Sequence, residues 1–240
     1  MKTLVVIPAR YGSTRFPGKP LAQILGKSLV QRVYEQCSML ENVTVVVATD
    51  DESIIAHCNS FNANSVLTSA NHQSGTDRVA EVACNKNYQD FDLIVNVQGD
   101  EPCILPEQLL SVINLLKNGA QIATVKKKIN ATIAQNPNVV KVVTDTAGKC
   151  LYFSRAAIPF HRNPNADISY FKHIGIYGFA KETLLAVSKL PLGQYENIEQ
   201  LEQLRWLENG FGIDCNETFF ESPAVDVPED IKVVEEFLKG

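Results

Sequence analysis

The chain has 240 residues, of which 45% are hydrophobic and 20% charged, and a formal net charge of −5. This size and composition are typical of a folded domain with a sizeable core, and they exclude a disordered chain. The negative net charge argues against a protein that binds nucleic acid, because such binding needs a surplus of Lys and Arg.

The first half of the chain alternates short apolar runs with helical patterns, which predicts a parallel sheet covered by helices. The strands are expected near Leu4–Ile7, Val43–Ala48, Ser65–Leu67, Leu93–Val97 and Ile122–Val125. The helices are expected near Ser28–Ser38, Asp51–Cys58, Asp77–Lys86 and Pro106–Lys117. In such a sheet, ligands bind at the carboxyl ends of the strands, so we expect Pro8–Pro20, Thr49–Asp50 and Gln98–Asp100 to meet there.

The second half is richer in β-structure, and Phe160–Tyr170 is a polar, Pro- and Asn-rich stretch that predicts an exposed or mobile loop. A hairpin, two further strands and two helices are expected at Lys141–Thr144 with Cys150–Phe153, at Ile174–Phe179 and Ile213–Phe219, and at Glu196–Asn209 and Glu229–Lys239. The predicted fold class is therefore α/β, a mostly parallel doubly wound sheet with a smaller β-rich subregion, in a single domain over residues 1–240.

The six cysteines are scattered without a Cys-x-x-Cys pair, so we interpret them as reduced core residues of a cytosolic protein. The first apolar run stops at Pro8, and no run of about 18 apolar residues follows. We therefore expect a cytoplasmic protein without membrane insertion.

The segment Pro8–Pro20 directly follows the first predicted strand and has the composition of a phosphate-binding loop. Glycine backbone N–H groups, hydroxyls and cations together suit a polyanion. The groups that supply them are Gly12, Gly18, Ser13, Thr14, Arg10, Arg15 and Lys19. The spacing matches neither the Walker loop nor the Gly-x-Gly-x-x-Gly loop. The alternative is a solvated loop with unrelated charges.

Two aspartates are candidate metal ligands. Asp100 follows the strand Leu93–Val97 and should face the phosphate loop, where Mg²⁺ prefers one or two carboxylates together with phosphate oxygens. Asp226 precedes Pro228 and a predicted helix, so it is either a second ligand or a helix N-cap.

Three further sites stay ambiguous on their residues alone. In the segment from His72 to Arg78, Thr76 or Asp77 is a candidate helix cap, whereas Ser74, Gly75 and Arg78 suit recognition of a base. His173 and Tyr177 share one side of a predicted strand, where a structural role is the alternative to ligand binding. Arg155 and the polar face with Glu202 and Gln203 are equally open to a structural or solvated role.

Taken together, the motifs closely resemble the 3-deoxy-manno-octulosonate cytidylyltransferases, also called CMP-Kdo synthetases. The matching segments follow one another over nearly the whole chain. They are Ile7–Pro20, Ala48–Asp50, His72–Arg78, Val95–Pro102, Asn136–Val143, Leu151–Arg155, His173–Gly178 and Leu201–Arg205. The chain departs from the family pattern at Ala224 and Val227, where the family usually has Gly and Thr, and in its short Phe160–Tyr170 loop.

The resemblance implies a Rossmann-like nucleotide-sugar transferase fold and a homodimer. It implies that CTP reacts with an eight-carbon 2-keto sugar acid, with Mg²⁺ as cofactor, to give the CMP-sugar and pyrophosphate. Residues 1–130 would mainly bind CTP, residues 131–220 would mainly bind the sugar and dimerise, and residues 221–240 would return to the main sheet.

Residue roles follow from the same resemblance, position by position. The catalytic residues would be Arg10, Lys19, Asp100 and Asp226, of which Asp100 and Asp226 would hold the metal. The CTP-binding residues would be Pro8, Ala9, Arg10, Arg15, Lys19, Ser74, Gly75 and Arg78. The sugar-binding residues would be Gln98, Arg155, His173, Tyr177, Glu202 and Gln203, with Arg155 and His173 suited to the carboxylate and Glu202 and Gln203 to hydroxyls.

Two alternatives remain at this point. The same reaction on 8-amino-Kdo or another nonulosonic acid would use pocket residues of the same kinds. A non-catalytic nucleotide-binding module is the alternative from another class, and the presence of Lys19, Asp100 and Asp226 together argues against it.

Overall fold

The computed structural model describes residues 1–12, 15–163 and 165–240. The hydroxyls of Ser13 and Thr14, which the sequence assigned to the phosphate loop, lie outside the described residues. Contacts divide the chain into two units, one formed by Met1–Leu110 with Glu221–Gly240 and the other by Ser111–Phe220. The helix α4 (Pro106–Lys117) contains the first point of division.

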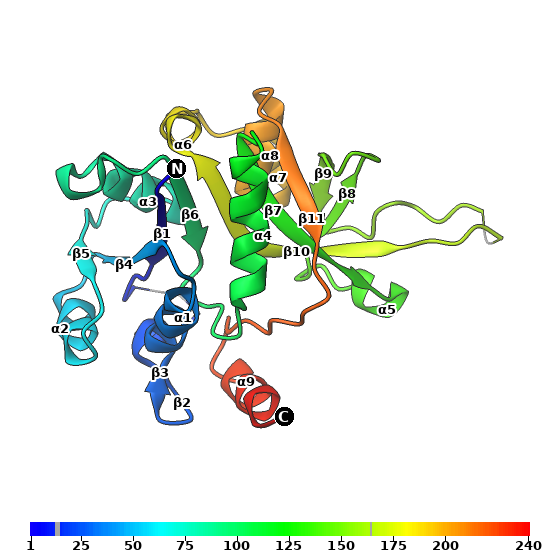
Figure 1. The fold of residues 1–240 in the computed structure, drawn as a ribbon. Helices are drawn as coiled ribbons and strands as arrows, with labels where there is room; N and C mark the ends of the chain where they lie inside the picture. The colour runs from blue at the N-terminus through cyan, green and yellow to red at the C-terminus, as the bar shows by residue number, and fades with distance from the viewer. Residues whose placement is uncertain (13–14, 164) are drawn as a thin grey trace. The chain divides into compact units, whose positions relative to one another are not determined.

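The first unit contains a parallel sheet in which β1 lies between β4 and β6, and β5 pairs with the far side of β4 (Figure 1). Its elements are β1 (Thr3–Pro8), η1 (Lys19–Leu21), β2 (Gln23–Ile24), β3 (Lys27–Ser28), α1 (Leu29–Ser38), β4 (Val43–Thr49), α2 (Glu52–Ser60), β5 (Ser65–Leu67), α3 (Gly75–Cys84), η2 (Lys86–Tyr88), β6 (Leu93–Val97) and α9 (Asp230–Lys239). The side chains from Leu4 to Ile7 are fully buried, as expected for a central parallel strand.

The parallel register places the carboxyl ends of β1, β4 and β6 at one edge of this sheet. Pro8 pairs with Ala48, and Val6 pairs with Asn96, so the chain leaves all three strands close together. The predicted meeting of Pro8–Pro20, Thr49–Asp50 and Gln98–Asp100 at this edge is confirmed.

The C-terminal segment of the first unit packs beside the exit of β6. The Val225 N–H donates to the Asp100 carbonyl over 2.9 Å. Val225 and Val234 are buried in a small core with Ile24, Leu29 and Cys103. Asp226, the residue after Val225, is thereby held next to the Asp100 segment.

The second unit contains a mixed sheet (Figure 1). The strand β7 pairs in parallel with β11 and antiparallel with β10, and β8 pairs with β10 and forms the predicted hairpin with β9. Its elements are β7 (Ile122–Ile129), α5 (Ala131–Ala134), β8 (Lys141–Thr144), β9 (Cys150–Ser154), β10 (Tyr170–Ala180), α6 (Lys181–Val187), α7 (Gln194–Glu199), α8 (Glu202–Glu208) and β11 (Ile213–Glu217). The predicted α/β class with a mostly parallel sheet is confirmed.

The single helix predicted at Glu196–Asn209 is wrong, because the chain breaks it into α7 and α8. Gln200 takes the left-handed conformation, with φ 54° and ψ 50°, and ends α7. Arg155 stabilises this break, since its Nε donates to the Glu199 carbonyl over 2.8 Å and its Nη2 donates to the Gln200 carbonyl over 3.4 Å. These contacts satisfy carbonyls that a continuous helix would have bonded internally.

Several helices and strands were not predicted from the sequence, or begin at a different residue from the predicted one. The β2–β3 hairpin, α5 and α6 were not predicted, and α3 begins at Gly75 instead of Asp77. The stretch 160–169 holds no helix or strand among its described residues, and Phe160 is 85% exposed, which agrees with the predicted exposed loop.

All six cysteines are free, and Cys84 alone among them is exposed. Within the described part of the chain, no helix is long and apolar enough to span a membrane.

Candidate active site

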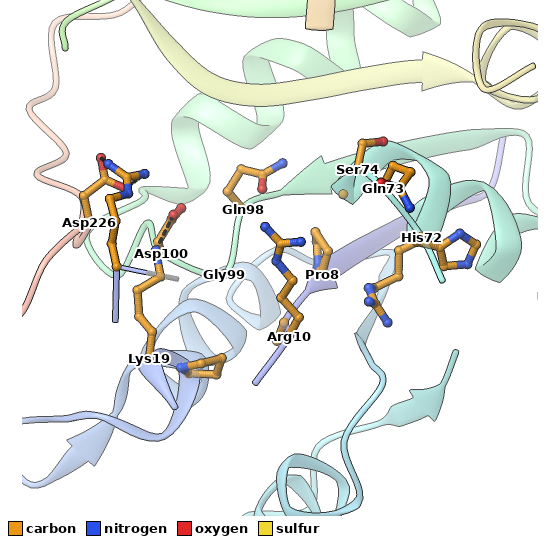
Figure 2. Close-up of a pocket in the computed structure, with 15 residues that line it drawn as sticks. Pro8, Arg10, Lys19, His72, Gln73, Ser74, Gln98, Gly99, Asp100 and Asp226 are labelled. Carbon is orange, nitrogen blue, oxygen red and sulfur yellow. Dashed lines mark hydrogen bonds and ion pairs between the residues drawn. The ribbon is translucent and has the colours of Figure 1, made fainter. Parts of the chain in front are cut away.

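A cavity of about 240 Å³ opens in the first unit at the carboxyl edge of its sheet (Figure 2). The lining residues come from the β1 exit loop, the β5–α3 loop, the exit of β6 and the C-terminal segment. They are Pro8, Ala9, Arg10, Arg15, Lys19, Pro20, His72, Gln73, Ser74, Gly75, Arg78, Gln98, Gly99, Asp100 and Asp226. All the residues predicted to bind CTP or metal therefore line one cavity, together with Gln98 from the predicted sugar set.

The cavity has two chemically different ends. Figure 2 shows Lys19, Asp100 and Asp226 at one end and His72, Gln73 and Ser74 at the other, with Pro8 and Arg10 between them. One end thus carries fixed charges of both signs, and the other presents the start of a helix.

Lys19 is placed by a tight turn at the end of the β1 exit loop. Gly18 precedes η1 with φ 71°, a left-handed conformation that favours glycine, and its N–H closes the loop on the Tyr11 carbonyl over 3.0 Å. Lys19 Nζ then donates to Asp100 Oδ2 over 2.8 Å and to the Val225 carbonyl over 2.9 Å. Lys19 thereby links the β1 loop, the exit of β6 and the C-terminal segment.

Arg15 forms a second, more open ion pair with Asp226. The guanidinium donates to both carboxylate oxygens, over 3.2 and 3.4 Å, and the two side chains are 67% and 53% exposed. An exposed pair of this kind adds little to folding stability, so Arg15 can exchange Asp226 for another anion at low cost.

The N-cap alternative for Asp226 is wrong. The helix α9 begins at Asp230 with Glu229 as its N-cap. Asp230 Oδ2 accepts the N–H groups of Asp226 and Val227 over 2.7 and 3.0 Å, so Asp230 orders the turn. The Asp226 carboxylate is left directed at Arg15 and the cavity.

Asp100 and Asp226 are the acidic side chains among the residues that line the cavity. No cluster of three or more His, Cys, Asp or Glu side chains suited to a metal occurs among the described residues. Two carboxylates on a cavity that also holds cations fit Mg²⁺, which fills its other positions with phosphate oxygens and water.

The opposite end of the cavity is built by the N-terminus of α3. Ser74 is the N-cap and forms a capping box with Asp77, in which each side chain accepts the other residue's backbone N–H over 3.1 Å. The predicted alternative of Thr76 or Asp77 as the cap is therefore wrong, because Ser74 is the cap and Asp77 supports it. This end presents helix N–H groups and the Ser74 hydroxyl to the cavity.

Gly99 is a functional position that the sequence patterns did not single out. A Cβ at Gly99 would lie 2.8 Å from the Pro8 carbonyl oxygen, which is closer than real Cβ contacts allow. Glycine therefore lets the exit of β6 approach the exit of β1 and close the floor of the cavity. The sequence signal for this position was the Gly-Asp pair after an apolar strand, but only Asp100 of that pair was predicted to have a role.

Asp50 and Glu81 support residues of this site, a role that the sequence did not indicate, although Asp50 lies in the Ala48–Asp50 motif. Arg78 is 3% exposed and its Nη2 donates to Asp50 Oδ2 over 2.8 Å. His72 pairs with Glu81, which also accepts the Ser69 N–H over 3.0 Å. Burial acts to raise the pKa of Glu81, but the bonds from His72 and Ser69 outweigh it and leave the pKa below its ordinary value.

Five of the predicted sugar-binding residues belong to the second unit, and three of them, His173, Tyr177 and Gln203, lie on β10 and α8 near an aromatic cluster. His173 and Tyr177 pack ring to ring with centroids 5.0 Å apart, and Tyr177 packs edge-on against Trp206 at 4.9 Å. Gln203 is buried at 6% exposure. The Tyr177 hydroxyl is buried and has no hydrogen-bond partner within the described ranges, which is typical of a group that awaits a ligand or water.

His173 is neutral in this environment. Desolvation by the surrounding side chains lowers its pKa from 6.5 to about 3. Its Nε2 lies 2.9 Å from Thr124 Oγ1, and that hydroxyl also lies 2.7 Å from the Ile176 carbonyl. Because the hydroxyl has one proton and the carbonyl can only accept, Nε2 carries the imidazole proton and Nδ1 is an acceptor.

Arg155 and Glu202 differ from their predicted environments. The Arg155 guanidinium donates to the carbonyls of Glu199, Gln200 and Pro137, so it connects the α7–α8 break to the segment before β8. Glu202 accepts from Arg205 Nη2 over 2.8 Å. In this state Arg155 bonds backbone carbonyls, and its predicted contact with a sugar carboxylate stays a prediction.

Comparison with known proteins connects this geometry to a family. The family model described as cytidylyltransferase matches residues 4–219. The chain belongs to the cytidylyltransferase family. It is therefore a nucleotidyltransferase, and the site described above is the candidate nucleotide site of a cytidylyltransferase.

Similarity to individual cytidylyltransferases extends over the full length. The chain is 48% identical to the 3-deoxy-manno-octulosonate cytidylyltransferase of Solibacter usitatus, over 100% of this chain and 95% of that protein. It is 44% identical to the 8-amino-3,8-dideoxy-manno-octulosonate cytidylyltransferase of Shewanella sediminis, over 98% of each. The predicted resemblance to the 3-deoxy-manno-octulosonate cytidylyltransferases is confirmed.

A solved structure agrees with these relatives. The chain is similar to CMP:2-keto-3-deoxy-manno-octonic acid synthetase complexed with CTP, with a TM-score of 0.94 and 38% identity, over 100% of this chain and 99% of that one.

Proposed function

We propose that this cytidylyltransferase transfers the CMP group of CTP to 3-deoxy-D-manno-octulosonate and releases pyrophosphate, and that its product serves lipopolysaccharide assembly. The observation that carries the proposal is the two-ended cavity, in which Arg10, Arg15 and Lys19 line the same space as Asp100 and Asp226. Full-length similarity to proteins named for this reaction supports the choice of sugar.

The triphosphate would lie at the charged end of the cavity. Lys19 and Arg15, which are paired with Asp100 and Asp226, would exchange those carboxylates for phosphate oxygens. Arg10 and Lys19 would offset the negative charge that builds on the departing pyrophosphate. The base would lie at the other end, against Pro8, Ala9, Ser74, Gly75 and Arg78.

We propose Mg²⁺ as the cofactor, held by Asp100 and Asp226. When bound, Mg²⁺ would supply charge neutralisation and orientation at the α-phosphate. These two carboxylates would become free to bind the ion when Lys19 and Arg15 turn to the phosphate oxygens.

The transfer itself needs little covalent help from the protein. The anomeric hydroxyl of the sugar loses its proton to water as its oxygen bonds to the α-phosphorus. In line with this attack, the bond from the α-phosphorus to the oxygen that bridges to the β-phosphorus breaks, and pyrophosphate leaves with the electron pair. The residues of the chain position the two substrates and balance charge, and no covalent enzyme intermediate is formed.

On the sugar side, we propose that Gln98, Arg155, His173, Tyr177, Glu202 and Gln203 contact the sugar acid. Because His173 is neutral with an acceptor at Nδ1, it suits a sugar hydroxyl better than the carboxylate. The Tyr177 hydroxyl, which finds no hydrogen-bond partner among the residues that the structure describes, supports its part in this set. The bonds of Arg155 to backbone carbonyls use one N–H on each of its three guanidinium nitrogens, so the second N–H on each terminal nitrogen could donate to the carboxylate.

We also propose a cytoplasmic homodimer. The second unit exposes apolar side chains, among them Leu151 at 61% and Ile198 at 67%, and a second copy would remove such surface from water. Light scattering at several concentrations would test the dimer, and a monomer at all of them would contradict it.

The reaction is tested by incubating the protein with CTP, Mg²⁺ and each sugar acid separately, and measuring pyrophosphate release and the mass of the product. We expect CMP-Kdo to form fastest. Faster turnover of 8-amino-Kdo would favour the alternative that the Shewanella sediminis relative represents. Absence of pyrophosphate with every sugar acid would contradict the proposed function.

A further inference from the structure

A buried ion pair stands behind the helical end of the cavity. Arg78, in the first turn of α3, is 3% exposed, and its Nη2 donates to Asp50 Oδ2 over 2.8 Å. Asp50 follows the last residue of β4 and its side chain is 17% exposed. The pair therefore joins a helix start to a strand end inside the protein.

A hydroxyl holds the other terminal nitrogen of the same guanidinium. Arg78 Nη1 donates to the hydroxyl of Thr68, which is buried at 7% exposure directly after β5. The Thr68 hydroxyl in turn donates to the Thr49 carbonyl over 3.0 Å. Both terminal nitrogens of the guanidinium are thus held, one by a carboxylate and the other by a hydroxyl bonded to the backbone, which sets the plane of the guanidinium.

This arrangement does more than satisfy a buried charge. Arginine keeps its proton when buried, so it needs an acidic partner, yet a buried ion pair seldom stabilises a fold more than apolar side chains of the same volume. Arg78 also lines the cavity, so the residue that Asp50 and Thr68 hold forms part of the wall of a ligand site. A fixed orientation is valuable at such a position.

The chemistry of that ligand follows from arginine being a donor without acceptor atoms. Cytosine offers two adjacent acceptors, O2 and N3, whereas uracil has an N–H donor at position 3. A guanidinium held in one plane can donate to the acceptors of cytosine, whereas its N–H groups oppose the N–H of uracil. A guanidinium free to rotate would discriminate less well.

We propose that Asp50 is a positioning residue that sets the selectivity of this site for cytosine over uracil by holding Arg78. The proposal rests on the proposed function, since it takes the cavity to be the nucleotide site. Thr68 is the second member of the same support. Asp50 acts through Arg78 and does not contact the base.

The test measures the binding of CTP and of UTP separately by calorimetry, without sugar, to the wild type and to Asp50→Asn. We expect the variant to bind CTP roughly tenfold or more weakly and UTP nearly as before, because a charge-assisted hydrogen bond is lost. The ratio of the two affinities should therefore fall by about tenfold. Asp50→Glu, which keeps the charge, should recover part of that ratio.

Asp51→Asn is the matched control. Asp51 is the neighbouring aspartate, caps α2 through the Ser53 N–H over 2.8 Å, and directs its side chain at Ser53. This variant should keep the CTP to UTP ratio of the wild type. If Asp50→Asn fails to fold in thermal unfolding, Thr68→Val tests the same support and should lower the ratio as well.

The results separate this inference from the proposed function. If Asp50→Asn and Thr68→Val keep the wild-type ratio, or weaken both nucleotides equally, Asp50 is a structural residue and the inference is overturned. A wild type that binds CTP and UTP equally overturns it too. Selective CTP binding that depends on Asp50, without turnover of any sugar acid, would uphold the inference and contradict the proposed reaction.

Discussion

Lys19 Nζ lies 2.8 Å from Asp100 Oδ2, so a cation expected to bind triphosphate is paired with a carboxylate expected to bind metal. The Arg15–Asp226 pair repeats this relationship at the same end of the cavity. Without nucleotide, each pair neutralises one cation and one carboxylate. This reduces the repulsion between the two cations and between the two carboxylates at this end of the cavity. The pairs also keep both carboxylates and both cations directed into the cavity until the ligands arrive.

Asp100→Asn should keep the fold and lose the reaction. Asparagine preserves the size of the side chain but removes the charge for the metal and for Lys19, so we expect kcat to fall roughly 100-fold or more. Turnover at several Mg²⁺ concentrations measures the loss, and circular dichroism confirms the fold. Activity equal to that of the wild type would contradict the assigned role.

Gly99→Ala should destabilise the protein through a steric clash. The added Cβ would lie 2.8 Å from the Pro8 carbonyl oxygen, so the exits of β1 and β6 must move apart. We expect a loss of about 1–3 kcal/mol in the free energy of unfolding, measured in urea.

The matched control for this clash is Gly12→Ala. A Cβ at Gly12 meets no atom within 4 Å among the described residues. Its stability should stay within about 0.5 kcal/mol of the wild type. If Gly99→Ala and Gly12→Ala lost the same free energy of unfolding, the close approach of Gly99 to Pro8 would not be the reason that position 99 needs glycine.

Arg155→Met should loosen the break between α7 and α8. The change removes donors from the carbonyls of Pro137, Glu199 and Gln200, and we expect a loss of about 1–3 kcal/mol in the free energy of unfolding. The KM for the sugar acid should rise more than the KM for CTP, because Glu202 and Gln203 follow this break.

Arg162→Met is the control for Arg155, since Arg162 is an exposed arginine of the loop before β10. It should unfold like the wild type. If Arg155→Met also unfolds like the wild type, the contacts of Arg155 with the three carbonyls do not stabilise the break.

His173 should make the stability depend on pH between about 3 and 6.5. Its pKa is about 3 in the folded protein and 6.5 ordinarily, so as the pH falls below 6.5 the unfolded chain binds a proton that the folded chain does not. The free energy of unfolding therefore falls with pH, by at most about 1.4 kcal/mol per pH unit.

Urea unfolding at several pH values checks this slope in three proteins. His173→Gln should reduce the slope, whatever its absolute stability. His161→Gln, which changes a histidine on the exposed loop, should keep the slope of the wild type. A His173→Gln slope equal to that of the wild type would contradict the burial of a neutral imidazole.

The sequence was informative where local pattern and topology agree. Leu4–Ile7 is a continuous apolar run that Pro8 follows, so both a buried strand and the loop at its carboxyl end were predictable. Parallel strands then required the loops after β1, β4 and β6 to meet. Most of the candidate nucleotide site follows from that rule together with the motifs.

What could not be predicted depends on contacts between distant residues. Nothing near Gln200 indicates a left-handed residue, because the carbonyls at the break are bonded by Arg155, which follows β9 and is distant in the sequence. The Arg78–Asp50 pair likewise joins residues that no periodic pattern connects. The neutral state of His173 arises from rings that the fold brings around it.

We expect the cavity of the first unit to bind CTP with its triphosphate at the Lys19 end and its base at the Ser74 end. A crystal structure of the protein with CTP and Mg²⁺ would show both positions at once. We predict phosphate oxygens on Arg10, Arg15 and Lys19, the metal between Asp100 and Asp226, and the cytosine beside Arg78. CTP bound elsewhere, or bound in the reverse direction, would contradict the claim.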